Sequence, residues 1–104
     1  MTTQIRAFRP FGDTQNIAVT TSAQTINLVY LFGTRAIRVC NIGTQTIFFV
    51  INDGTSSNTA SINTSTPVPA GNTEIFTLPT GATSISVIAA SAGSTFYVTE
   101  GEGL

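Results

Sequence analysis

Few side chains in this sequence could perform chemistry. There is no histidine, and Cys40 is the one cysteine. Acid–base catalysis of the glycosidase kind needs two carboxylates held on a rigid frame. The closest acidic pair in the sequence, Glu100 and Glu102, lies in a glycine-rich tail, and the remaining acids are scattered: Asp13, Asp53 and Glu74. The sequence therefore predicts no catalytic residue and no enzyme activity.

Metal and cofactor ligands are equally scarce. Without histidine and with a single cysteine, the chain cannot build a His/Cys zinc site. Asn52, Asp53 and Asn58 offer too little oxygen charge for calcium, so Asn52-Asp53-Gly54 is better interpreted as a turn. Cys40 has no histidine to activate it and is interpreted as a small, half-buried side chain. We expect neither a metal nor a cofactor.

The charge content excludes further classes of partner. Only 9% of the residues are charged and the net charge is −1, with four arginines and no lysine. Such a surface cannot neutralise a row of phosphates, so nucleic-acid binding is not expected. No apolar run approaches the roughly 20 residues that a membrane span requires, and the N-terminus shows no signal peptide, so we expect a cytoplasmic product without a membrane partner.

The residue types favour strands. Nineteen threonines accompany many Val, Ile and Phe residues, which suit a pleated sheet. Alternation and turn signals predict an all-β chain: an antiparallel β-sandwich, jelly-roll-like, with seven to eight short strands. The domain is expected over residues 16–100, after an extended N-terminal arm (1–15) and before a C-terminal tail (101–104). Expected strands cover 17–21, 25–32, 36–42, 46–52, 74–78, 84–90 and 95–99, with a long loop at 55–66 that could hold one weak strand and a turn at 67–72.

Several residues are candidates for contact with a partner protein. The strand at 46–52 is apolar on both faces, which places Phe48 either in the core or at a subunit interface. In the arm, arginines alternate with aromatic residues, a composition typical of a docking peptide, although a disordered terminus is the alternative. Arg35 and Arg38 flank one strand and could be solvated edge charges or partners of acids on another subunit. The predicted interface residues are Arg6, Phe8, Arg9, Phe11, Arg35, Arg38 and Phe48.

Three stretches carry a resemblance to a known group of proteins. They are RVCNIGTQTIFFV at 38–50, PAGNTEIFTLP at 69–79 and FYVTEGEGL at 96–104. Over residues 36–104 the chain resembles small tailed-bacteriophage capsid decoration (cement, head-stabilising) proteins. It departs from their pattern at Glu100, where others have proline. The shared motifs consist of strand and turn residues and include no catalytic signature.

The resemblance implies a structural virion protein. Such a protein binds the outer surface of the capsid as a homodimer or homotrimer and stabilises contacts between major capsid protein subunits. The alternative is a tail- or fibre-associated protein that recognises a host glycan. Glycan sites favour exposed aromatic residues, for which the chain offers Tyr30 and Tyr97 but no tryptophan.

Overall fold

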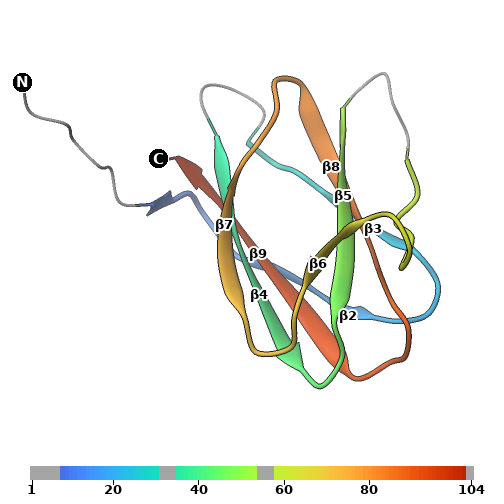
Figure 1. Cartoon of the computed structure of the whole chain (residues 1–104). Coiled ribbons are helices and arrows are strands. Elements are labelled where there is room, and N and C mark those ends of the chain that lie inside the picture. The colour runs from blue at the N-terminus through green and yellow to red at the C-terminus, as the bar shows by residue number, and fades with distance from the viewer. Residues whose placement is uncertain (1–7, 31–34, 54–57, 103–104) are drawn as a thin grey trace, which may run out of the picture.

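The computed structural model describes residues 8–30, 35–53 and 58–102, which form two antiparallel sheets without a helix (Figure 1). The first sheet has the order β1-β9-β4-β7, with β2 also paired to β9; its strands are β1 (Arg9–Pro10), β2 (Gln15–Val19), β4 (Ala36–Gly43), β7 (Thr73–Thr77) and β9 (Ser94–Glu102). The second sheet has the order β3-β8-β5-β6; its strands are β3 (Gln24–Asn27), β5 (Ile47–Asp53), β6 (Thr66–Val68) and β8 (Ala82–Ala89). Within the described residues, no helix could span a membrane.

The strand order is that of a jelly roll. With the two-residue β1 set aside, one sheet reads β2-β9-β4-β7 and the facing sheet reads β3-β8-β5-β6. From β2 to β9, each strand is followed by a strand of the other sheet, except that β5 and β6 are neighbours in the second sheet. Eight strands connected in this way form a jelly roll. The predicted fold class, an all-β antiparallel sandwich, is confirmed.

The core lies between the inner faces of the two sheets. Alternate residues of β4 and β9 point inward, and Ile37, Val39, Phe96 and Val98 are all fully buried. From the second sheet Phe49 reaches across, so that its ring centroid lies 6.0 Å from that of Phe96. The predicted inward faces of these strands, and of β8, are correct because alternation along a strand is a local property that the sequence displays directly.

The motif stretch at 38–50 contains two residues with structural roles, Asn41 and Gly43. Gly43 has φ +147°, and a Cβ there would collide with the backbone of Gly93 and Ser94, so the turn between β4 and β5 requires glycine. Asn41 is buried, and its amide nitrogen donates to the carbonyls of Gln45 (2.7 Å) and Val68 (2.8 Å). This side chain therefore ties β4 to β6 of the opposite sheet.

The structure corrects several expected boundaries. The stretch interpreted as a turn at 67–72 begins inside β6, whose Val68 is fully buried opposite Ile47. The last strand does not stop at 99 but runs through Glu102, so the expected tail starts two residues too early. Both extensions depend on pairing with distant strands, which local sequence does not reveal.

Candidate functional site

The predicted arm lies against the body of the sandwich in its described part. Arg9 and Pro10 pair with Glu102 and Gly101 at the end of β9, and the Phe11 N–H donates to the Glu100 carbonyl at 2.7 Å. The arm boundary predicted at residue 15 is corrected, because β2 already begins at Gln15 and pairs with β9. The N-terminal segment and the last strand thus meet at one corner of the molecule (Figure 1).

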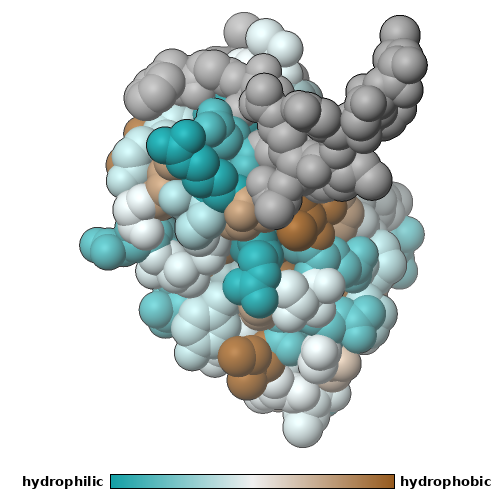
Figure 2. Space-filling model, turned by 90° about the vertical axis from the view of Figure 1, so that its left-hand side faces the viewer, coloured by the Kyte–Doolittle hydropathy of each residue, from teal (hydrophilic) through white to brown (hydrophobic). Residues whose placement is uncertain are grey.

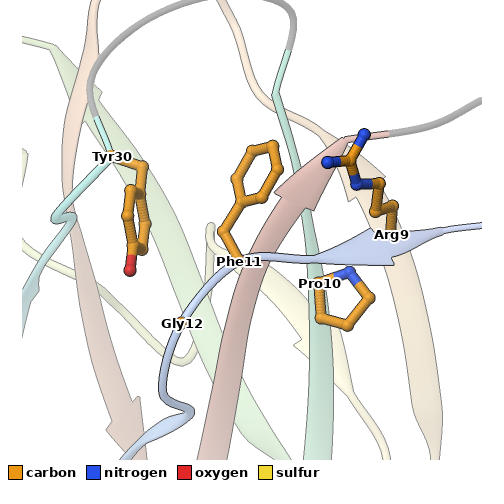
Figure 3. Close-up of a pocket in the computed structure, with 5 residues that line it drawn as sticks. All are labelled: Arg9, Pro10, Phe11, Gly12 and Tyr30. Atoms are coloured by element: carbon orange, nitrogen blue, oxygen red, sulfur yellow. The ribbon is translucent and has the colours of Figure 1, made fainter.

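A shallow pocket opens at this corner. Its volume is about 320 Å³, and its lining residues are Arg9, Pro10, Phe11, Gly12 and Tyr30. Figure 3 shows the Tyr30, Phe11 and Arg9 side chains standing in a row on one side of the N-terminal strand. The Phe11 and Tyr30 rings are tilted by 57° with centroids 5.6 Å apart, and the Arg9 guanidinium lies 6.0 Å from the Phe11 centroid.

Gly12 makes this packing possible. It has φ +59°, and a Cβ at this position would overlap the Tyr30 hydroxyl. A side chain at residue 12 would therefore displace the Tyr30 ring from its present position beside Phe11.

A buried carboxylate holds the wall of the pocket in place. Glu100 is 3% exposed, and its two oxygens accept the N–H groups of Val29 (2.8 Å) and Tyr30 (3.0 Å). The Tyr30 carbonyl in turn accepts from the Arg35 guanidinium at 2.8 Å. The main chain at Tyr30 is therefore held through both its N–H and its carbonyl, which fixes the backbone that carries the ring.

Glu100 was expected to lie in a glycine-rich tail. The structure instead places it at the inner side of β9, where main-chain donors compensate its charge. Glu102 is the carboxylate at the surface, and it pairs with Arg9 at 3.0 Å. The side chains of Arg9 and Glu102 are 74% and 38% exposed, so the ion pair orients Arg9 more than it stabilises the fold.

The predicted interface residues are distributed over the molecule. Arg9 and Phe11 meet at the pocket, and half-buried Phe8 comes close to Gly101. Arg38 is exposed on the outer face of β4, opposite Thr99 of β9, and is not among the residues that line the pocket. Phe48 is half-buried on the outer face of the second sheet, between Pro67 and Ile88. The prediction for Arg6 lies outside the described residues.

Arg35 was predicted at the surface, and the structure corrects that placement. It is 7% exposed, and its guanidinium donates to the carbonyls of Tyr30 (2.8 Å) and Ala82 (2.7 Å). Arg35 precedes a strand, which resembles an exposed edge position in sequence. Its burial depends on its contacts with Tyr30 and Ala82, which the local sequence around Arg35 does not indicate.

Sequence reasoning missed two residues of the site. Tyr30 was weighed only as one of two tyrosines that could contact a glycan, and nothing in the sequence joins it to Phe11. Glu102 was treated as part of a flexible tail, although an acid at the end of a strand and an arginine in the arm form a complementary pair. This charge complementarity was the one feature of the sequence that could have indicated the contact between Glu102 and the arm.

The described residues contain no cluster of three or more metal-ligating side chains. The pocket offers aromatic surface, one guanidinium and the Tyr30 hydroxyl. Such an arrangement can bind an apolar or aromatic group.

Comparison with solved structures finds a similar fold in another protein. No protein-family model matches the chain, and no curated protein matches it. A solved structure from Bacillus endospore appendages, described as a novel family of disulfide-linked pili, superposes with a TM-score of 0.62. The alignment covers 100% of this chain and 95% of that chain at 16% sequence identity. At this identity the likeness shows the shared β-sandwich fold alone.

Proposed function

We propose that this protein is a structural subunit of a virus particle. In this role it is a decoration protein that binds the outer surface of a tailed-bacteriophage head and stabilises contacts between major capsid protein subunits. It acts as a homodimer or homotrimer. The motif resemblance over residues 36–104 and the jelly-roll sandwich support the proposal.

The observation that carries the proposal is the pocket at the N-terminal corner. Arg9 and Phe11 were selected from the sequence as docking residues, and they lie beside Tyr30 in an exposed pocket. Arginine and aromatic residues are enriched in the energetically dominant parts of interfaces. An apolar side chain of the shell protein would fill this pocket.

The test is binding to undecorated heads, followed by co-sedimentation and by the temperature at which the heads melt. We expect the protein to coat the heads and raise their melting temperature. Phe11→Ala should weaken binding at least about tenfold, because it removes a ring at the centre of the pocket. Ile62→Ala is the matched control, since it truncates an exposed apolar side chain on a loop of the other sheet. Absence of head binding, or equal binding by Phe11→Ala, would contradict the proposal.

A filament subunit is the second candidate, and the likeness to the appendage pilus favours it. One cysteine per copy can form at most one intermolecular disulfide, whereas a continuous disulfide-linked chain needs at least two per subunit. A filament of these 104 residues would therefore depend on non-covalent contacts. Electron microscopy of the purified protein tests whether it forms filaments. Filaments that persist in reductant would favour this candidate, and discrete oligomers would reject it.

The glycan-binding alternative would use the same pocket, because a sugar ring stacks on exposed aromatic side chains. Binding of the purified protein to host glycans, lost in Phe11→Ala and retained in Ile62→Ala, would favour a tail or fibre location.

A further inference from the structure

The first sheet ends in an edge strand that has one neighbour. β7 pairs with β4 along its whole length, and no described strand lies on its other side. Such an edge presents a row of main-chain donors and acceptors to any strand that can pair with it. In Figure 1, β7 borders the side of the molecule where β4 and β9 also lie.

The remaining edges of the sandwich are protected. β6 has three residues and contains Pro67, which has no N–H to offer. The β2 edge is bridged to β3, since the Gln15 amide nitrogen donates to the Asn27 carbonyl at 2.9 Å. β3 itself is short and mainly polar. Among the described strands, β7 is therefore the edge most open to pairing.

The hydrogen-bond pattern shows which backbone groups of β7 are available. The Leu78 N–H donates to the Arg35 carbonyl at 2.9 Å, which makes these two residues a hydrogen-bonded pair. Bonded and non-bonded pairs alternate in an antiparallel ladder. Glu74 and Phe76 therefore bond to β4, whereas the N–H and C=O groups of the intervening residues point toward the open edge: Thr73, Ile75 and Thr77.

The side chains of these residues form a self-complementary row. Ile75 is 38% exposed, and Thr73 and Thr77 are exposed on either side of it. All three project from the outer face of the sheet. A strand with an apolar centre and a threonine on each flank matches its own copy in antiparallel orientation, because threonine then meets threonine and isoleucine meets isoleucine.

We propose that two copies of this chain pair through β7 about a two-fold axis at Ile75, which joins their first sheets into one continuous antiparallel sheet. Each Ile75 faces the Ile75 of the second copy, and each Thr73 faces the opposite Thr77. These pairs use the outward backbone groups and each exchanges two main-chain hydrogen bonds. Because the interface is isologous, it closes at a dimer.

Charge selects this register over its neighbours. With the axis at Ile75, Glu74 lies opposite Phe76 of the second copy. With the axis at Glu74, two carboxylates would stand directly opposite each other, which is unfavourable. With the axis at Phe76, Thr73 would face Pro79, which lies beyond the end of β7 and has no N–H to donate. The Ile75 register is the one that pairs all three outward residues of β7 with one another.

The dimer should be weak. An edge of five residues buries less than the roughly 1,200 Å² typical of stable interfaces, so association should depend on concentration. On a capsid, weak pairing gains strength because the copies are held side by side. The inference deepens the self-association in the proposed function. Its test uses the purified protein alone, so its failure would leave head binding undecided.

The experiment is sedimentation velocity from about 10 μM to about 1 mM, a range that covers weak complexes. The wild type should shift from monomer to dimer. Ile75→Lys and Ile75→Glu should each weaken the dimer at least about tenfold, because like charges then face each other at the axis. Ile42→Lys is the matched control: Ile42 is 61% exposed on the same face, but it belongs to β4 inside the sheet.

An equal mixture of Ile75→Lys and Ile75→Glu should recover the dimer, since the introduced charges are then opposite. Recovery also shows that both variants are folded. A wild type that stays monomeric throughout the range overturns the proposal, as does a dimer unaffected at Ile75. If each variant is monomeric and their mixture also stays monomeric, the proposed register is wrong. If the wild type forms open-ended polymers, the interface does not close at a dimer.

Discussion

The two outer faces of the sandwich are built from the same alternating strands, yet one is covered and the other is open. On the second sheet, the chain around Asn58 and Ala60 crosses the outer face. The Asn52 side chain exchanges two hydrogen bonds with the backbone of Asn58, at 2.9 and 2.8 Å. The Ser86 hydroxyl accepts the Ala60 N–H at 3.0 Å. Asn52, Ser86 and Ala60 are all buried as a result.

On the first sheet, Phe8 lies close to Gly101 at one end of β9, and the outer face around Arg38 and Ile42 has no such cover within the described residues. Arg38 and Ile42 project from β4 and are exposed, and the side chain of Cys40 between them is half-buried beside Thr73. Arg38 is the one charged residue among the described outward positions of β2, β9, β4 and β7. Figure 2, viewed from this side, shows a mostly pale surface with separate brown patches. The comparison teaches that outward polar residues become structural where a loop crosses them and stay available for partners where none does.

The contrast occurs even within one strand, and there it predicts the largest effect. On β9, Thr99 faces the open side, whereas Glu100 points inward and accepts two main-chain N–H groups. Glu100→Ala leaves both donors without an acceptor and should lower the free energy of unfolding by about 3 kcal/mol. Urea denaturation measures this, with Thr99→Ala as the control at about 0.5 kcal/mol. Equal losses in the two variants would show that Glu100 is not clamped as described.

Asn52→Ala tests the covered face. The variant removes both side-chain bonds to the segment at Asn58, so we expect a loss of about 2 kcal/mol and faster amide exchange at residues 58–60. Hydrogen exchange and chemical denaturation together measure the two effects. A stable variant with unchanged exchange would mean that the segment is held by other contacts.

Ser86→Ala is expected to have a smaller effect on the same face. It removes one acceptor and leaves the buried Ala60 N–H unpaired, which should cost about 1 kcal/mol. Thermal and urea unfolding would detect this difference. Because Ser86 and Asn52 hold the same segment, the double variant should lose less than the sum of the single losses, and strict additivity would argue against a shared role.

Ile42→Thr on the open face should have the smallest effect. The Ile42 side chain is 61% exposed and loses little contact, so the unfolding free energy should stay within about 0.5 kcal/mol of the wild type. A loss above about 1 kcal/mol would show that this face is covered in solution. Repeating the measurement at high protein concentration would then reveal whether a second copy provides the cover.

The sequence predicted the parts of this molecule that depend on local pattern. The strands at 36–42 and 84–90, with Ile37, Val39 and Val87 directed inward, match the buried residues of β4 and β8. The turn at 69–72 is also present, with an Asn72 N–H to Pro69 carbonyl bond and a left-handed Gly71. The interface predictions for Arg38 and Phe48 remain predictions, as does the absence of enzyme activity.

The site was less predictable because its residues are far apart along the chain. Arg9 and Phe11, which were predicted as interface residues, lie at the pocket, and their neighbours Tyr30 and Glu102 come from distant parts of the chain. Their role at an interface remains a prediction. Arg35 was wrongly expected at the surface, because an arginine next to a strand is usually solvated. In the structure it is buried, and its guanidinium donates to two main-chain carbonyls.

The sequence by itself determined an all-β sandwich, the inner faces of its main strands and the scarcity of catalytic and metal-binding groups. These properties follow from residue type and from a two-residue period, which need no knowledge of distant neighbours. Only the tertiary structure decided that Glu100 is buried, that the N-terminal segment builds a pocket on β9 and that β7 is left as the open edge. The Val29–Glu100 bond spans 71 residues, and such contacts arise from how the sheets pack, because burial and pairing are properties of the assembled layers.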